Sequence, residues 1–221
     1  MKYLKMLGLA AVAAMALTAV IGAGTASAAT ICTTDTLHAS GTACGTNAIH
    51  GWHAKAETPI KASTTEAKLT SGFINVTCES TAEGKIKSAT TGHGDITNLT
   101  FKNCIDNFGR PCTANSTASA AVPWTVTTAY TSGTNGTMTV HFPTGTFTCK
   151  NPFNPSGAEV HCEYTANTAT VTATGSHTEP KLDAVNVSLT KHGTSSVLCS
   201  NTATWNGTYK VTTPSSLVVT P

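Results

Sequence analysis

The sequence predicts an all-β protein, an antiparallel β-sandwich or open barrel that is braced by disulfide bonds. Threonine occurs 44 times in 221 residues, and β-branched side chains fit the pleated surface of strands. Short runs alternate between apolar and polar residues, which is the pattern of half-buried strands. The eight cysteines are an even number, as expected for a disulfide framework in an exported chain.

Residues 1–28 have the three parts of a secretory signal peptide. A basic start with Lys2 and Lys5 precedes an apolar run, which ends in the small residues Ala26-Ser27-Ala28. We expect cleavage between Ala28 and Ala29, and a secreted or cell-surface product without a transmembrane segment. The alternative is an uncleaved anchor, because the apolar run is almost long enough to span a bilayer.

The charge balance excludes one class of partner. The formal net charge of +2 belongs to Lys2 and Lys5, since the rest of the chain holds 11 basic and 11 acidic residues. Nucleic-acid binding depends on clustered Lys and Arg that contact phosphates. We therefore expect no nucleic-acid partner.

All the cysteines follow the signal segment: Cys32, Cys44, Cys78, Cys104, Cys112, Cys149, Cys162 and Cys199. Eight cysteines allow 105 pairings, and the sequence does not choose among them. Local spacing suggests one set: Cys32 with Cys44, Cys78 with Cys104, Cys149 with Cys162 across a turn-rich segment, and Cys112 with Cys199. No C-x-x-C motif occurs, so we expect no zinc site.

The predicted strands follow one another along the chain. Alternating runs occur at Ile74–Cys78, Val122–Thr127, Met138–Phe142, Val160–Tyr164 and Val185–Leu189. Turn signals separate them, among them Asn135-Gly136 and His192-Gly193. Residues 29–66 are less regular, and we expect an N-terminal extension there, laid over one all-β domain of residues 67–221.

The residues that could carry chemistry form no recognisable catalytic or metal motif. His50-Gly51-Trp52-His53 lacks the acid of an H-E-x-x-H metal motif, and His141 and His161 are expected on adjacent strands with solvated side chains. The chain has no G-x-S-x-G motif. The acids outside the signal segment are spread out, for example Asp95, Asp106, Glu163, Glu179 and Asp183. We expect no catalytic residue, no metal and no cofactor, and hence a non-enzymatic protein.

Residues from about Lys68 to Thr213 resemble small exported proteins of soil bacteria, mostly of undefined function. The resemblance rests on these segments: Val76–Ser80, Ile96–Phe101 leading to Cys104, Val122–Val126, and Cys199 with Trp205–Tyr209. More remotely, the order of two cysteines and then Pro-Trp is similar to the exported family named for activating alkane oxidation. That similarity implies a small extracellular protein linked to hydrophobic substrates and surface films.

We expect an exported, non-enzymatic interaction protein of the cell surface or the extracellular space. Its partner would be envelope, biofilm or hydrophobic material, contacted through exposed aromatic residues. Trp52, Phe108 and Phe153 lie in predicted loops and are candidates for such contact, although each could instead be packed in the core. The alternatives are a carbohydrate-binding β-sandwich module and a secreted hydrolase.

Overall fold

The computed structural model describes residues 29–34, 38–44, 51–151, 153–154 and 157–221. The expected signal peptide, with Ala28 at its cleavage site, lies outside the described residues. Every regular element in the described ranges is a β-strand, so the predicted all-β class is confirmed. The strands are β1 (Thr30–Thr33), β2 (His38–Ala43), β3 (Trp52–Ala54), β4 (Thr58–Ser71), β5 (Ile74–Ser88), β6 (His93–Asp106), β7 (Cys112–Ser116), β8 (Trp124–Ser132), β9 (Asn135–His141), β10 (Thr144–Cys149), β11 (Val160–Thr165), β12 (Thr168–Thr174), β13 (Lys181–His192), β14 (Thr202–Thr213) and β15 (Val218–Thr220).

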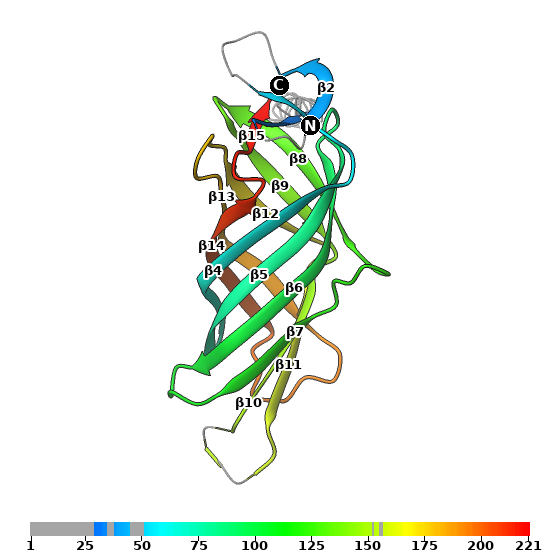
Figure 1. Cartoon of the computed structure of the whole chain (residues 1–221). Helices are drawn as coiled ribbons and strands as arrows, with labels where there is room; N and C mark the ends of the chain where they lie inside the picture. Colours follow the sequence, from blue (N-terminus) through cyan, green and yellow to red (C-terminus); the bar gives the residue numbers. More distant parts are fainter. Residues whose placement is uncertain (1–28, 35–37, 45–50, 152, 155–156) are drawn as a thin grey trace, which may run out of the picture.

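Eight antiparallel strands close into a barrel (Figure 1). Their order is β12-β9-β8-β6-β5-β4-β14-β13, and pairing of β12 with β13 completes the circle. A barrel of about this number of strands has an interior that side chains fill, or that holds one small ligand. The predicted disulfide-braced barrel is therefore present, and its sheet is closed.

The strand β13 changes partner along its length, and this gives the barrel two different ends. Its first residues, Lys181–Asp183, pair with β12, whereas Thr190–His192 pair with β11. The strands β10 and β7 extend the sheet beyond β11, and β7 lies beside β6, where the Ser116 hydroxyl donates to the Leu99 carbonyl at 2.9 Å. In Figure 1, β7, β10 and β11 therefore complete the lower part of the wall.

A second, four-stranded sheet covers the upper end of the barrel in Figure 1, with the order β15-β1-β3-β2. It joins the beginning and the end of the described chain, since Thr30 pairs with Thr220. The boundary expected between residues 66 and 67 lies inside β4. Residues 58–66 belong to the barrel wall, because Ile60 and Ala62 turn apolar side chains inward like the residues after the boundary.

In most strands, alternate residues are buried in the core, as the period-two pattern predicts. Ile74, Val76 and Cys78 are buried, and so are alternate residues of β11. Three predicted core positions are wrong. Val185 is exposed because β13 bulges between Ala184 and Val187, and Phe142 is exposed because β9 has already ended at His141. Val122 is exposed because β8 begins only at Trp124.

Four disulfide bonds are present: Cys32–Cys44, Cys78–Cys104, Cys112–Cys149 and Cys162–Cys199. The suggested pairings of Cys149 with Cys162 and of Cys112 with Cys199 are wrong, whereas those of Cys32 with Cys44 and of Cys78 with Cys104 are confirmed. In the register of β10 and β11, Cys149 lies opposite Val160 and Cys162 lies opposite Phe147. On the other side of β10, Cys149 lies directly opposite Cys112, which makes that pair the natural one.

Tyr164 offers a test of core packing in the lower barrel. Its side chain is buried, stacks on Phe147, donates a hydrogen bond to the Ser200 carbonyl at 2.8 Å and contacts the Ser71 hydroxyl. Tyr164→Phe should lower the free energy of unfolding by about 1–3 kcal/mol, because it leaves buried polar partners unsatisfied. Urea unfolding measures this loss. Tyr130→Phe, at a half-buried tyrosine, is the control and should change stability by about 0.5 kcal/mol or less.

Candidate functional site

Four loops lie at the end of the barrel that is lowest in Figure 1, which we call the lower end: residues 72–73, 107–111, 193–201 and the described residues of the β10–β11 connection, 150–151, 153–154 and 157–159. Hydrogen bonds join two of these loops to neighbouring strands. The Asn107 amide donates to the Asn75 carbonyl at 3.0 Å, the Ser200 amide to the Ser71 hydroxyl at 3.4 Å, and the Ser196 amide to the His161 carbonyl at 2.8 Å. These bonds hold the 107–111 and 193–201 loops against the barrel.

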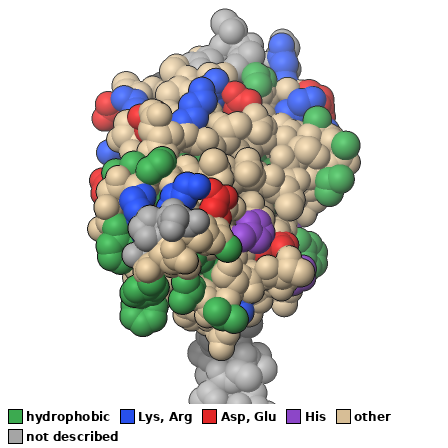
Figure 2. Space-filling model, turned by 90° about the horizontal axis from the view of Figure 1, so that it is seen from below, with side chains coloured by type: hydrophobic (Ala, Val, Ile, Leu, Met, Phe, Trp, Pro, Cys, Tyr) green, Lys and Arg blue, Asp and Glu red, His purple; other side chains and the backbone are tan. Residues whose placement is uncertain are grey.

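Large apolar side chains are exposed on this surface (Figure 2): Phe73 (70%), Ile105 (52%), Phe108 (53%), Phe153 (72%) and Val197 (97%). Two of the three aromatic residues proposed from the sequence, Phe108 and Phe153, lie at this end. The third, Trp52, lies on β3 at the opposite end of the molecule. Sequence reasoning missed Phe73, whose only signal is its place after Gly72 in a two-residue turn between strands.

The turn that displays Phe108 is built around one buried carboxylate. Asp106 Oδ1 accepts hydrogen bonds from the amides of Phe108 and Arg110, each at 2.9 Å, and Oδ2 accepts one from Arg110 Nε at 3.0 Å. The guanidinium of Arg110 also lies 4.8 Å from the centre of the Phe108 ring, a cation–π distance. The hydrogen bonds of Asp106 and the Arg110 guanidinium thus hold the Phe108 side chain in its outward position.

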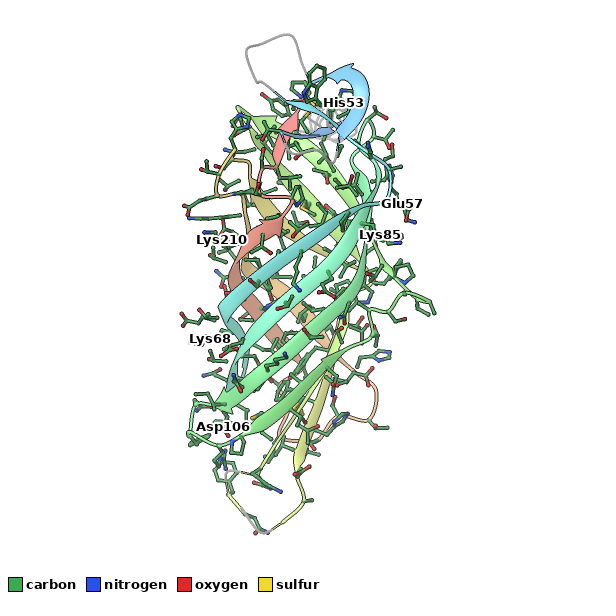
Figure 3. The ribbon with its side chains drawn as sticks, viewed as in Figure 1. His53, Glu57, Lys68, Lys85, Asp106 and Lys210 are labelled. Atoms are coloured by element: carbon green, nitrogen blue, oxygen red, sulfur yellow. A yellow bond between two sulfur atoms is a disulfide. The ribbon has the colours of Figure 1, made fainter. Side chains whose placement is uncertain are left out.

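The ionisation of Asp106 reflects this network. Burial by itself raises the pKa of this carboxyl, because the charged form loses its hydration. Hydrogen bonds from the Arg110 side chain and from the amides of Arg110 and Phe108 outweigh burial, and the net pKa lies below its ordinary value. Figure 3 shows Asp106 near the lower end of the barrel.

Three of the four disulfides brace the lower end. Cys78–Cys104 joins β5 to β6, Cys112–Cys149 joins β7 to β10, and Cys162–Cys199 fastens the 193–201 loop to β11. Cross-links of this kind restrict the conformations that a loop can reach. The disulfides therefore restrain the part of the protein that carries the exposed apolar side chains.

The Arg and Lys side chains named here for the lower end have partners within the protein. Arg110 pairs with Asp106, Lys150 Nζ lies 2.8 Å from Glu159, and Lys191 Nζ donates to the Cys199 carbonyl at 3.3 Å. These local partners leave little charge for an external ligand. The arrangement favours an uncharged partner.

The side wall of the barrel has a different character. Lys85 and Lys87 lie 3.0 and 2.6 Å from Glu57 (Figure 3), and hydrogen bonds from Lys87 and then Lys85 lower the pKa of that carboxyl. Exposed pairs of this kind contribute little to stability. The threonines of β12 also point outward, as expected for solvent-facing hydroxyls. These parts of the wall are therefore polar and exposed.

A polar groove lies on the wall where β4 bulges between Thr64 and Ala67. Its volume is about 530 Å³, and its lining among the described residues consists of hydroxyl side chains, two lysines and one glutamate. It is large enough for a small sugar. It lacks the aromatic residues on which the carbohydrate-binding interpretation depended.

The barrel interior contains two apolar cavities. The lower one, of about 70 Å³, lies among Phe101, Trp124, Phe147 and Trp205, and the upper one, of about 80 Å³, lies beneath the covering sheet. Both are bordered almost entirely by apolar surface. They are separate from the lower end and from the polar groove.

Among the described residues, the histidines proposed as candidates lie apart. His141 and His161 lie on β9 and β11, which are not neighbours in the sheet, so the expectation of adjacent strands is wrong. His192 Nδ1 lies 3.1 Å from Glu163, but the nearby Ser195 hydroxyl donates to the His192 carbonyl at 2.9 Å, and not to the imidazole. That arrangement lacks the contact between nucleophile and base on which a serine hydrolase depends.

The remaining candidates give no ligand set. His50 lies outside the described residues. Asp106, Cys112 and Cys149 place a carboxylate and two sulfurs within 4.8 Å of one another, but both sulfurs belong to one disulfide. A metal needs thiolates for such coordination.

The part of the chain that the structure describes contains no helix with the length and apolarity needed to span a bilayer. Comparisons of the sequence with protein-family models and with curated proteins, and of the fold with solved structures, found no match.

Proposed function

We propose that this is an exported, non-enzymatic interaction protein whose lower end binds an uncharged apolar surface. The observation that carries the proposal is the group of exposed apolar side chains at the disulfide-braced lower end: Phe73, Ile105, Phe108, Phe153 and Val197. Exposed apolar side chains that gather at one end of a folded protein are typical of an interaction site. Four disulfides and the signal-like residues 1–28 support export, because disulfides persist in oxidising compartments.

The chemistry of the lower end supports an apolar surface as the partner. Its cations have internal partners, and the mature chain would have no formal net charge. Attraction to a charged surface would weaken as salt is added. Binding driven by apolar contact should persist at high salt.

The test is adsorption of the mature protein to hexadecane droplets in water. The variant Phe73→Ser with Phe153→Ser should adsorb at least about tenfold more weakly, because burial of one large apolar side chain is worth about 1.5–3 kcal/mol. Adsorption of the unmodified protein should not fall as salt is raised.

The matched control is Phe142→Ser with Val185→Ser, which removes two equally exposed apolar side chains from the side wall. It should adsorb like the unmodified protein. Equal losses in both variants would show general stickiness and contradict a dedicated surface. Adsorption that soluble sugars abolish would favour the carbohydrate-binding alternative.

A further inference from the structure

The lower cavity has a lining that is unusual for a well-packed core. Protein interiors leave few voids larger than a water molecule. This void, of about 70 Å³, is bordered by aromatic rings on several strands, among them Phe101, Trp124, Phe147 and Trp205. Large flat side chains therefore surround a space that they do not fill.

The buried polar groups beside the cavity already have partners. The Ser116 hydroxyl donates to the Leu99 carbonyl at 2.9 Å, and the Trp124 indole N–H donates to the Thr117 hydroxyl at 3.1 Å. Tyr164 donates to the Ser200 carbonyl at 2.8 Å. The protons of these groups are already donated, so a guest in this cavity would find no free hydrogen-bond donor among them. Water needs two to four hydrogen-bond partners, so the space suits an apolar guest.

Gly145 keeps the space open. It belongs to β10 and lies on the same face as Phe147 and Cys149, which are buried. A Cβ added at Gly145 would meet a single neighbouring atom, the Asn115 carbonyl oxygen, at 3.4 Å, an ordinary contact distance. The backbone there would accept any side chain, so neither strain nor crowding requires glycine at this position.

We propose that the lower cavity is a binding site for a small, uncharged, apolar molecule. A dry cavity of about 150 Å³ holds benzene, which has six heavy atoms, so this cavity of about 70 Å³ holds a guest of about three heavy atoms. The rings of Phe147 and Trp205 supply dispersion contacts, and the polar groups offer no free donor to a guest that needs to accept a hydrogen bond. This site is separate from the lower end, because none of the five exposed apolar side chains there lines it.

The test compares two guests of three heavy atoms, propane and dimethyl ether, by NMR of backbone amides in the mature protein. Propane should produce saturable shifts at Gly145, Ala114 and Phe147. Dimethyl ether should bind at least about tenfold more weakly, since its oxygen would be buried without a donor. Equal affinity for the two guests, or shifts that do not saturate, would overturn the proposal.

The variant Gly145→Val should fill the space and weaken propane binding at least about tenfold. Gly145→Ala, a smaller addition, controls for the loss of glycine itself and should still bind. Amides around the upper cavity, such as those of Met138 and Ala173, report whether the fold is intact, because Gly145 does not border that cavity. Unchanged binding in a folded Gly145→Val protein would place the guest elsewhere and overturn the proposal. If Gly145→Val does not fold, Ala114→Val takes its place, because Ala114 borders the same cavity from β7. Weakened binding would again support the proposal, and unchanged binding would overturn it.

Discussion

Replacing Asp106 by alanine is expected to lower the free energy of unfolding by about 3–5 kcal/mol, the usual cost of breaking a buried ion pair. The carboxylate is fully buried and accepts hydrogen bonds from the Phe108 amide and from the amide and side chain of Arg110. Without it, these donors lose their acceptor and the guanidinium remains half-buried without its counter-charge. Urea unfolding of the two proteins measures the difference.

Glu159→Ala is the matched control for Asp106→Ala. Glu159 is also an acid of the lower end in an ion pair, with Lys150, but both side chains are about half exposed. Its loss should cost about 0.5 kcal/mol or less. Adsorption to hexadecane should also weaken in Asp106→Ala, because the Phe108 turn loses its support, while Glu159→Ala keeps it. Similar destabilisation in the two variants would contradict the structural role of the buried pair.

The same carboxylate predicts a pH dependence. The pKa of Asp106 is lower in the folded protein than its ordinary value of 3.8. Its ionised form therefore stabilises the fold above pH 3.8, and this contribution is lost as the pH falls through the lower, folded-state pKa. The stability difference between the unmodified protein and Asp106→Asn should be constant near neutral pH and should shrink below pH 3.8. A difference that is independent of pH would show that the charge does not matter.

Local alternation predicted much of the fold because it depends only on neighbouring residues. Ile74, Val76 and Cys78 are buried on one face of β5, as their spacing predicts. The same rule failed at Val185, because the bulge in β13 leaves two outward-facing residues, Val185 and Asn186, between the buried Ala184 and Val187. Nothing in the sequence around Val185 marks that bulge, which forms against β14.

Closure of the barrel could not be predicted, because it depends on contacts between distant segments. The strand β13 pairs with β12 at one end and with β11 at the other, and no local pattern encodes such a switch. The candidate site shows the same limit. Phe108 and Phe153 could be proposed as contacts, but their meeting with Phe73 and Val197 at one end follows from topology.

The disulfide Cys162–Cys199 is expected to be a main brace of the lower end. Replacing both cysteines by alanine should lower the free energy of unfolding by about 4 kcal/mol, the chain-entropy value for a bond that spans 37 residues. Both side chains are buried, so their replacement also removes core contacts. Thermal or urea unfolding under non-reducing conditions measures the change.

The disulfide Cys32–Cys44 at the opposite end is the matched control. It spans 12 residues, and its replacement by two alanines should cost about 3 kcal/mol by the same relation. Only the Cys162–Cys199 replacement releases the loop that carries Val197, so only that variant should adsorb more weakly to hexadecane at a temperature where both are folded. Equal loss of adsorption in the two variants would mean that global stability, and not bracing of the loops, keeps the apolar side chains in place.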